Sequence, residues 1–166
     1  MSNYPMLSLA GAPTSGRNEI QRLTPGGTIS AGTYKVTFEG QQTAAIAWDA
    51  TAALVQAALE DLSNVAVGDV IVSGGPTQTA FLTIQFTKNL GGIDRTQVSV
   101  QSSLTGTNPT LSPSTPTAGI LGSFRGAQPG CLLQDTTNGI LYRNTGTSAA
   151  PVWTVPAADA VWVLTP

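Results

Sequence analysis

The sequence feature that most constrains the fold is a strict alternation of apolar and polar side chains in residues 33–39. Tyr34, Val36 and Phe38 fall on one face, and Thr, Lys and Glu side chains fall on the other, which indicates a strand with one buried face. A short Gly-Gln-Gln turn follows, and the alternation resumes in residues 44–48. The two segments are therefore predicted to pair as an antiparallel hairpin.

An alanine-rich segment from Asp49 to Leu62 predicts one helix, with Asp49 as its N-cap. Its apolar residues share one stripe at 3.6 residues per turn: Leu54, Val55, Ala58, Leu59 and Leu62. We expect the helix to pack on the sheet through Leu54, Ala58 and Leu62. Further strands are predicted at 65–73, 81–87 and 97–101. The sequence thus predicts an α+β fold, a mostly antiparallel sheet with one packed helix.

Segments of other composition flank this predicted core domain, which spans residues 28–101. Residues 1–27 carry scattered proline and glycine and predict an extended N-terminal arm. Residues 102–119 contain no charged side chain and are rich in Ser, Thr and Pro, which is typical of a linker. Residues 120–166 predict a small C-terminal β module around the turn Asn138–Gly139. Its short strands are expected at 131–134, 140–143, 151–154 and 160–164.

Charge and hydropathy exclude several classes of function. Charged residues make up 10% of the chain, against about 25% in an average soluble domain. The net charge is −2 and the seven basic residues are scattered, so we expect no nucleic-acid partner. No apolar run approaches the roughly 18 residues that span a bilayer, and no secretory signal is recognisable, so no membrane role is expected.

The residues that commonly carry catalysis are scarce. The chain has no histidine, and its one cysteine, Cys131, allows neither an internal disulfide nor a cysteine-built metal site. Glu60 and Asp61 are the only adjacent acidic pair, and successive helical residues point about 100° apart, which does not suit a shared metal. We therefore expect no enzyme activity, no metal and no cofactor.

Two stretches resemble virion proteins of tailed phages. The first comprises GTYKVTFEG (32–40), QTAAIAWDATAALVQAALE (42–60) and VGDVIVSGG (67–75), and it is similar to small domains in head decoration and tail accessory proteins of actinobacterial phages. This likeness covers residues 32–101. The second, residues 130–153 with DTTNG and YRNTGT, resembles short β-motifs of phage appendage proteins.

The resemblance implies a structural role in a virus particle. The preferred expectation is a capsid decoration protein, made in the bacterial cytoplasm and bound to the outer surface of the phage head, which it stabilises. Its partners would be the major capsid protein and copies of itself, with a trimer as the expected oligomer because shells offer threefold sites. The alternatives are a tail-tube, fibre or baseplate component, or a glycan- or receptor-binding module of the virion.

Five residues are the candidate interface residues of this sequence. Tyr4, Leu7 and Leu9 lie in the predicted arm, which cannot form a core alone and would bury them against a neighbour. Trp153 and Trp162 lie in a module with little interior, where an aromatic side chain can anchor a subunit contact. For both tryptophans, a place in the module's own core is the competing interpretation.

Overall fold

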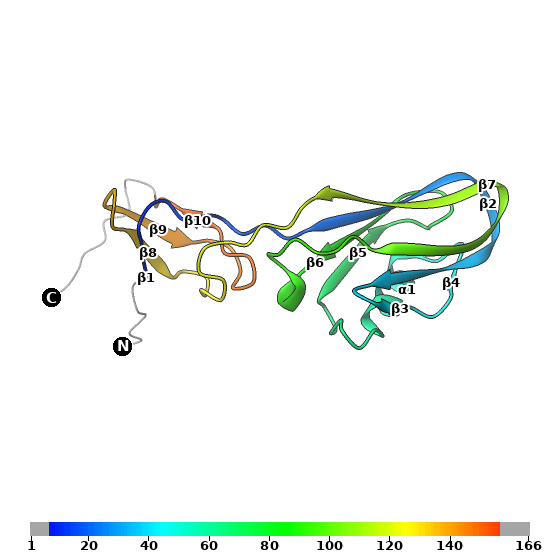
Figure 1. Cartoon of the computed structure of the whole chain (residues 1–166), viewed down its shortest axis with the longest axis horizontal. Coiled ribbons are helices and arrows are strands. Elements are labelled where there is room, and N and C mark those ends of the chain that lie inside the picture. The colour runs from blue at the N-terminus through cyan, green and yellow to red at the C-terminus, as the bar shows by residue number, and fades with distance from the viewer. Residues whose placement is uncertain (1–6, 157–166) are drawn as a thin grey trace.

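The structure is a computed structural model that describes residues 7–156 of the 166-residue chain. Two parts lie in line and are joined by two extended segments (Figure 1). We call the larger part, residues 20–117, the core domain, and the smaller part, built from residues 7–9 and 132–154, the C-terminal module. The fold is α+β, with mostly antiparallel sheets, and the described residues contain one α-helix, as predicted.

The core domain contains six strands, the helix and one turn of 3-10 helix. Its elements are β2 (Ile20–Phe38), β3 (Gln41–Gln42), β4 (Ile46–Ala47), α1 (Ala52–Glu60), β5 (Val70–Gly74), β6 (Leu82–Phe86), η1 (Lys88–Leu90) and β7 (Ser99–Thr117). The C-terminal module is a four-stranded sheet in the order β1-β8-β9-β10. Its strands are β1 (Leu7–Leu9), β8 (Leu132–Asp135), β9 (Ile140–Asn144) and β10 (Trp153–Thr154).

The long antiparallel pair β2 and β7 forms the frame of the core domain. The two strands pair from Ile20 and Thr117 at one end to Thr37 and Ser99 at the other. On its other side β2 pairs with β6 along its first residues and with β4 and β3 along its last. The pair turns back on itself (Figure 1), and the Gln97 side chain contacts the Pro113 carbonyl and the Thr115 hydroxyl at 3.2 Å each.

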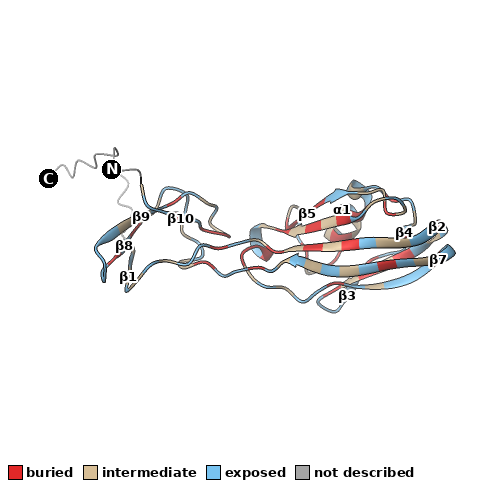
Figure 2. Cartoon of the chain, turned by 90° about the horizontal axis from the view of Figure 1, so that it is seen from above, coloured by how far each residue is buried: buried red, intermediate tan, exposed pale blue. Residues whose placement is uncertain are grey.

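The predicted alternation of residues 33–39 is confirmed. Tyr34, Val36 and Phe38 are at most 1% exposed, and the hairpin to β3 and β4 forms as expected. The Phe38 ring stacks on Phe86 of β6, with ring centroids 5.0 Å apart. Figure 2 shows buried residues alternating with partly buried and exposed residues along β2. Each fully buried side chain of this size stabilises the fold by about 1.5–3 kcal/mol.

The helix begins later than predicted. Its N-cap is Thr51, whose side chain makes no capping hydrogen bond, whereas Asp49 lies outside the helix. A Gln56 side-chain oxygen accepts the Val72 N–H at 3.1 Å, so α1 covers the outer edge of β5. The helix therefore replaces the strand that would otherwise pair there.

The predicted packing face of α1 is partly wrong. Val55 and Leu59 are 0% and 2% exposed, but Leu54 is 61% exposed. Leu62 is buried just beyond the helix, and Ala58 packs against the core. Adjacent helical residues point about 100° apart, so a helix of nine residues that buries Val55 turns Leu54 toward solvent.

The segment 102–119, predicted as a linker, instead forms most of β7. Only Leu104 and Leu111 are buried within this strand, so it lacks the apolar alternation by which strands are recognised. Its order comes from backbone pairing with β2. Proline is tolerated because β7 is an edge strand, with β2 as its single strand partner among the described residues.

The segment 1–27, predicted as an extended arm, also differs from the expectation in its described part. Residues 20–27 belong to β2, and Leu7–Leu9 forms β1, which pairs in parallel with β8. Between them the Gly16 N–H donates to the Pro151 carbonyl at 2.6 Å. The apolar residues of the arm thus complete a sheet of their own chain, which the sequence pattern did not indicate.

The buried side chain of Asp135 links two loops of the C-terminal module by hydrogen bonds. Asp135 accepts hydrogen bonds from the Gly11 and Thr137 N–H groups at 3.0 and 2.9 Å and from the Asn138 side-chain amide at 2.8 Å. The Asn138 amide is the main cause that lowers the pKa of Asp135, against the opposing effect of burial, and the backbone N–H groups add to it. Asp135 therefore joins the end of β1 to the turn between β8 and β9.

Candidate functional site

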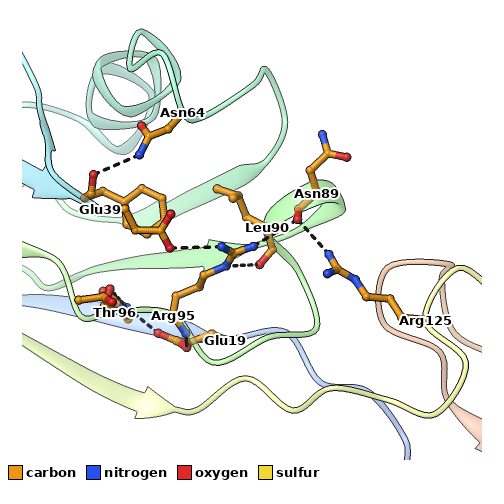
Figure 3. A network of polar contacts seen from close by, with 10 residues as sticks. Glu19, Glu39, Asn64, Asn89, Leu90, Arg95, Thr96 and Arg125 are labelled. Carbon is orange, nitrogen blue, oxygen red and sulfur yellow. Dashed lines mark hydrogen bonds and ion pairs between the residues drawn. The ribbon is translucent and has the colours of Figure 1, made fainter.

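A polar network joins the core domain to the C-terminal module (Figure 3). The Asn89 carbonyl accepts hydrogen bonds from Arg95 of the core domain at 3.3 Å and from Arg125, which leads into the module, at 2.9 Å. Arg95 also donates to the Leu90 carbonyl at 3.1 Å and forms an ion pair with Glu39 at 3.2 Å. One carbonyl is thus shared by guanidinium groups from the two parts of the chain.

Below this network, the loop before β7 is fixed by a buried carboxylate. Glu19 is fully buried and accepts hydrogen bonds from the Gln21 side-chain amide and from the Arg95 backbone N–H. The Gln21 side-chain oxygen in turn accepts the Val98 N–H at 2.7 Å. Because its side-chain oxygens accept hydrogen bonds from both Gln21 and the Arg95 N–H, Glu19 positions the chain that carries Arg95.

A cavity of about 700 Å³ opens at the junction of the two parts. Residues from both parts line it: Asn18, Gln56, Gly68, Val70, Ile71, Thr87, Lys88, Asn89, Arg125, Gly126, Thr147, Ser148 and Ala149. The two charged residues in this lining are both cationic. Lys88 is held by a hydrogen bond to the Val67 carbonyl at 3.1 Å, and Arg125 by its bond to Asn89. We call this cavity the polar hollow.

A second cavity, of about 390 Å³, adjoins the first, and we call it the apolar hollow. It is lined by Leu7, Phe124, Arg125, Gly126, Ala127, Gln128 and Cys131. Arg125 and Gly126 line both cavities, so the two hollows meet at this point. We call the residues that line the two hollows the junction surface.

The chemistry of the junction surface suits binding. Amides, hydroxyls and two cations can hold a polar or acidic partner, while Leu7 and Phe124 can contact an apolar side chain. The charged side chains among the residues that line the hollows are Lys88 and Arg125. The Glu60 and Asp69 carboxylates lie behind this lining, where they accept hydrogen bonds from Gly68 and Asn89. Within residues 7–156, no group of three or more acidic or cysteine side chains is placed to hold a metal ion.

The structure separates the five candidate interface residues of the sequence. Leu7 lines the apolar hollow, and half-buried Leu9 uses its carbonyl to accept the Thr136 N–H at 2.9 Å. Tyr4 and Trp162 lie outside the described residues. That these residues contact a neighbouring subunit stays a prediction.

Trp153 lies in the interior of the C-terminal module. It is 6% exposed, its indole N–H donates to the Ser123 carbonyl at 2.9 Å, and its ring meets Phe124 edge to face at 6.3 Å. The side chain thus supports the wall of the apolar hollow from behind. This position agrees with the core interpretation of Trp153.

Most of the residues that line the polar hollow were not predicted from the sequence. Asn18, Lys88, Arg125 and Ser148 come from four distant segments, and none belongs to a recognisable motif. The pairing of β1 with β8 and the contact of Gly16 with Pro151 place these segments together. Only long-range pairing creates the site, so a single sequence carries no local signal for it.

Comparison with known proteins finds no match by family or curated sequence and a weak similarity by structure. No family model matches the sequence, and no curated protein matches it. The structure is similar to a solved chain described as "Mycobacterium phage Patience", with a TM-score of 0.42 and 17% sequence identity. The match covers 87% of this chain and 52% of that chain, so this chain spans about half of its length. Within residues 7–156, no helix is long and apolar enough to cross a membrane.

Proposed function

We propose that the chain is a structural component of a tailed-phage particle, and specifically a capsid decoration protein on the outer surface of the head. In this role it binds and stabilises, and it performs no catalysis. The resemblance of residues 32–101 and 130–153 to virion proteins supports the proposal. The observation that carries it is the junction surface, where two neighbouring hollows share Arg125 in their lining.

The junction surface would attach the chain to the major capsid protein. An apolar side chain of the partner fits the apolar hollow beside Leu7 and Phe124, and burial of one such side chain contributes about 1.5–3 kcal/mol. Lys88 and Arg125 are exposed, so each pairing with an acidic group adds at most about 1 kcal/mol. One contact of this kind is weak, and attachment of many copies to a repeating shell supplies the avidity.

The rest of the surface suits close packing on a particle. The chain has only 10% charged residues, and β7 exposes Ser and Thr side chains along most of its length. Neutral polar groups cost less free energy to desolvate than charged groups when a neighbour covers them. Copies of the chain can therefore lie against the shell and against each other, and a trimer at threefold sites remains the proposed arrangement on the head.

The proposal is tested by adding purified protein to heads and tails of the phage that encodes it, with the protein removed from the particles. Arg125→Glu reverses the charge where the hollows meet, and Arg143→Glu makes the same change at an exposed residue of β9 outside both hollows. We expect head occupancy with wild type and Arg143→Glu, and binding at least about tenfold weaker with Arg125→Glu. Melting curves check that both variants fold.

Two outcomes would contradict parts of the proposal. Binding of labelled wild-type protein to tails instead of heads, seen by electron microscopy, would replace the decoration role by a tail component. Equal head occupancy of Arg125→Glu and wild type would show that the junction surface is not the attachment site.

A further inference from the structure

The outer edge of β7 is the most open backbone edge in the core domain. Its first part, Ser99–Thr105, pairs with β2 on one side, and the described residues place no strand on the other. Gln101, Ser102 and Ser103 are all exposed. The edge of β5, by comparison, is covered by α1 through the bond from Val72 to Gln56.

The register shows which backbone groups of β7 point outward. The Gly32 carbonyl accepts the Trp48 N–H at 3.1 Å, so the polar groups of Gly32 point toward β4 and away from β7. In an antiparallel ladder its partner Leu104 then belongs to a non-hydrogen-bonded pair, and its own N–H and C=O point to the free edge. Backbone groups alternate in direction along a strand with a period of two residues, so the N–H and C=O of Ser102 also point to the free edge.

The opposite end of the segment gives the same result independently. The Val36 carbonyl accepts the Thr43 N–H at 2.9 Å, and the Val36 N–H donates to the Thr43 hydroxyl at 3.0 Å. Val100, the β7 partner of Val36, therefore also directs its N–H and C=O to the free edge. One of the outward groups is covered locally, because the Leu104 N–H donates to the Ser102 hydroxyl at 3.3 Å. This bond is long and easily exchanged for a carbonyl acceptor.

The side chains of this edge lack the features that keep sheet edges apart. Natural edges are usually blocked by charged residues, above all lysine, or by proline. The stretch 99–108 contains neither, and the three prolines of β7 all follow it. An uncharged Ser, Thr and Gln strand can lie antiparallel to a copy of itself without like-charge contacts.

The nearest cation does not oppose such self-pairing. Lys35 lies on β2 opposite Gln101, one strand inside the edge. In a pair of copies the two Lys35 backbones would be three strand spacings apart, about 14 Å. This exceeds the Debye length of about 8–10 Å at physiological salt, so their repulsion is screened.

We propose that two copies of this chain pair through residues 99–105 of β7, antiparallel and centred on Ser102, so that the two sheets become continuous. Ser102 would then pair with its own copy and Val100 with Leu104, which gives roughly six inter-strand hydrogen bonds. The contact is a twofold one, distinct from any threefold contact on a particle, and it rests on the backbone geometry of β7 rather than on the proposed function.

The experiment measures self-association of the full-length protein by sedimentation equilibrium from about 10 µM to 1 mM, because an edge contact is smaller than a standard interface. Ser103→Lys places a cation on the outer face of the edge, and Ala57→Lys adds the same charge at an exposed position of α1, which contacts β4 and β5. Ser102→Pro removes the outward donor at the centre without adding charge. Thermal melting confirms folding of each variant.

We expect a concentration-dependent dimer for wild type and Ala57→Lys, and an association constant at least about tenfold lower for Ser103→Lys and Ser102→Pro. A wild-type protein that stays monomeric over the whole range overturns the proposal. So does a folded Ser103→Lys variant that dimerises like wild type. A dimer that is lost when residues 157–166 are removed, but not in Ser103→Lys or Ser102→Pro, would show that the contact depends on that segment and not on the edge, which also overturns the proposal.

Discussion

Replacement of Leu59 by alanine tests how α1 packs on the core domain. Leu59 is 2% exposed and Leu54, on the same helix, is 61% exposed. Loss of three buried carbons removes about 2.4 kcal/mol of transfer free energy, and the cavity left behind brings the total to about 3–5 kcal/mol. Leu54→Ala removes the same atoms from a mostly solvated site, so its effect stays within about 0.5 kcal/mol.

The measurement is urea unfolding followed by far-UV circular dichroism, with calorimetry as a second probe. For a chain of this size 1 kcal/mol corresponds to about 2–4 °C, so Leu59→Ala should lower the melting temperature by about 6–20 °C. Leu54→Ala should melt within about 2 °C of wild type. If the two variants lose equal stability, or if Leu54→Ala is the more damaging, Leu54 packs on the core domain as the sequence predicted and our assignment is wrong.

Two further predictions concern the turns and the strand pairing. The hydrogen bonds from Asn138 and the backbone lower the pKa of Asp135 in the folded module. The contribution of Asp135 to stability is therefore complete above the ordinary pKa of about 3.9 and is lost as the pH falls through the lowered pKa. The difference in melting temperature between wild type and Asp135→Asn should shrink below about pH 4, and a constant difference down to pH 2 would contradict this prediction. Gly32→Ala should cost at least about 2 kcal/mol more than Gly40→Ala in urea unfolding, since both have positive φ (+99° and +84°) but only a Cβ at Gly32 would clash with a backbone oxygen, that of Ser103. Equal costs would show that the close contact with β7 relaxes freely.

The sequence was most informative where side chains alternate with respect to one hydrophobic core. Tyr34, Val36 and Phe38 gave the central strand because burial of one face requires a period of two. The one-helix α+β class followed from the same pattern. Leu54 was misplaced because an alanine-rich helix leaves its buried face poorly defined, and one residue step rotates the face by about 100°.

The strand predicted at 97–101 covers only the start of β7, and the rest of β7 could not be predicted because its order has no local cause. Ser, Thr and Pro predominate between Ser102 and Gly119, and this composition is also that of a solvated linker. Pairing with β2 holds the segment, and that partner lies more than sixty residues earlier in the chain. The junction surface was missed for the same reason, since Asn18, Lys88, Arg125 and Ser148 meet only after the strands have paired.

The pairing of β2 with β7 has a consequence for synthesis on the ribosome. Thr37 and Ser99 are separated by 99 − 37 = 62 positions, and Ile20 and Thr117 by 117 − 20 = 97 positions. At about 5–20 residues per second, the last residues of β2 emerge roughly 3–12 s before their partners emerge. In a nascent chain the edge of β2 that faces β7 therefore stays unpaired for seconds, which is long compared with the microseconds in which local hairpins close. Neighbouring ribosomes on one message carry such strands at the same time, so pairing between nascent copies competes with folding.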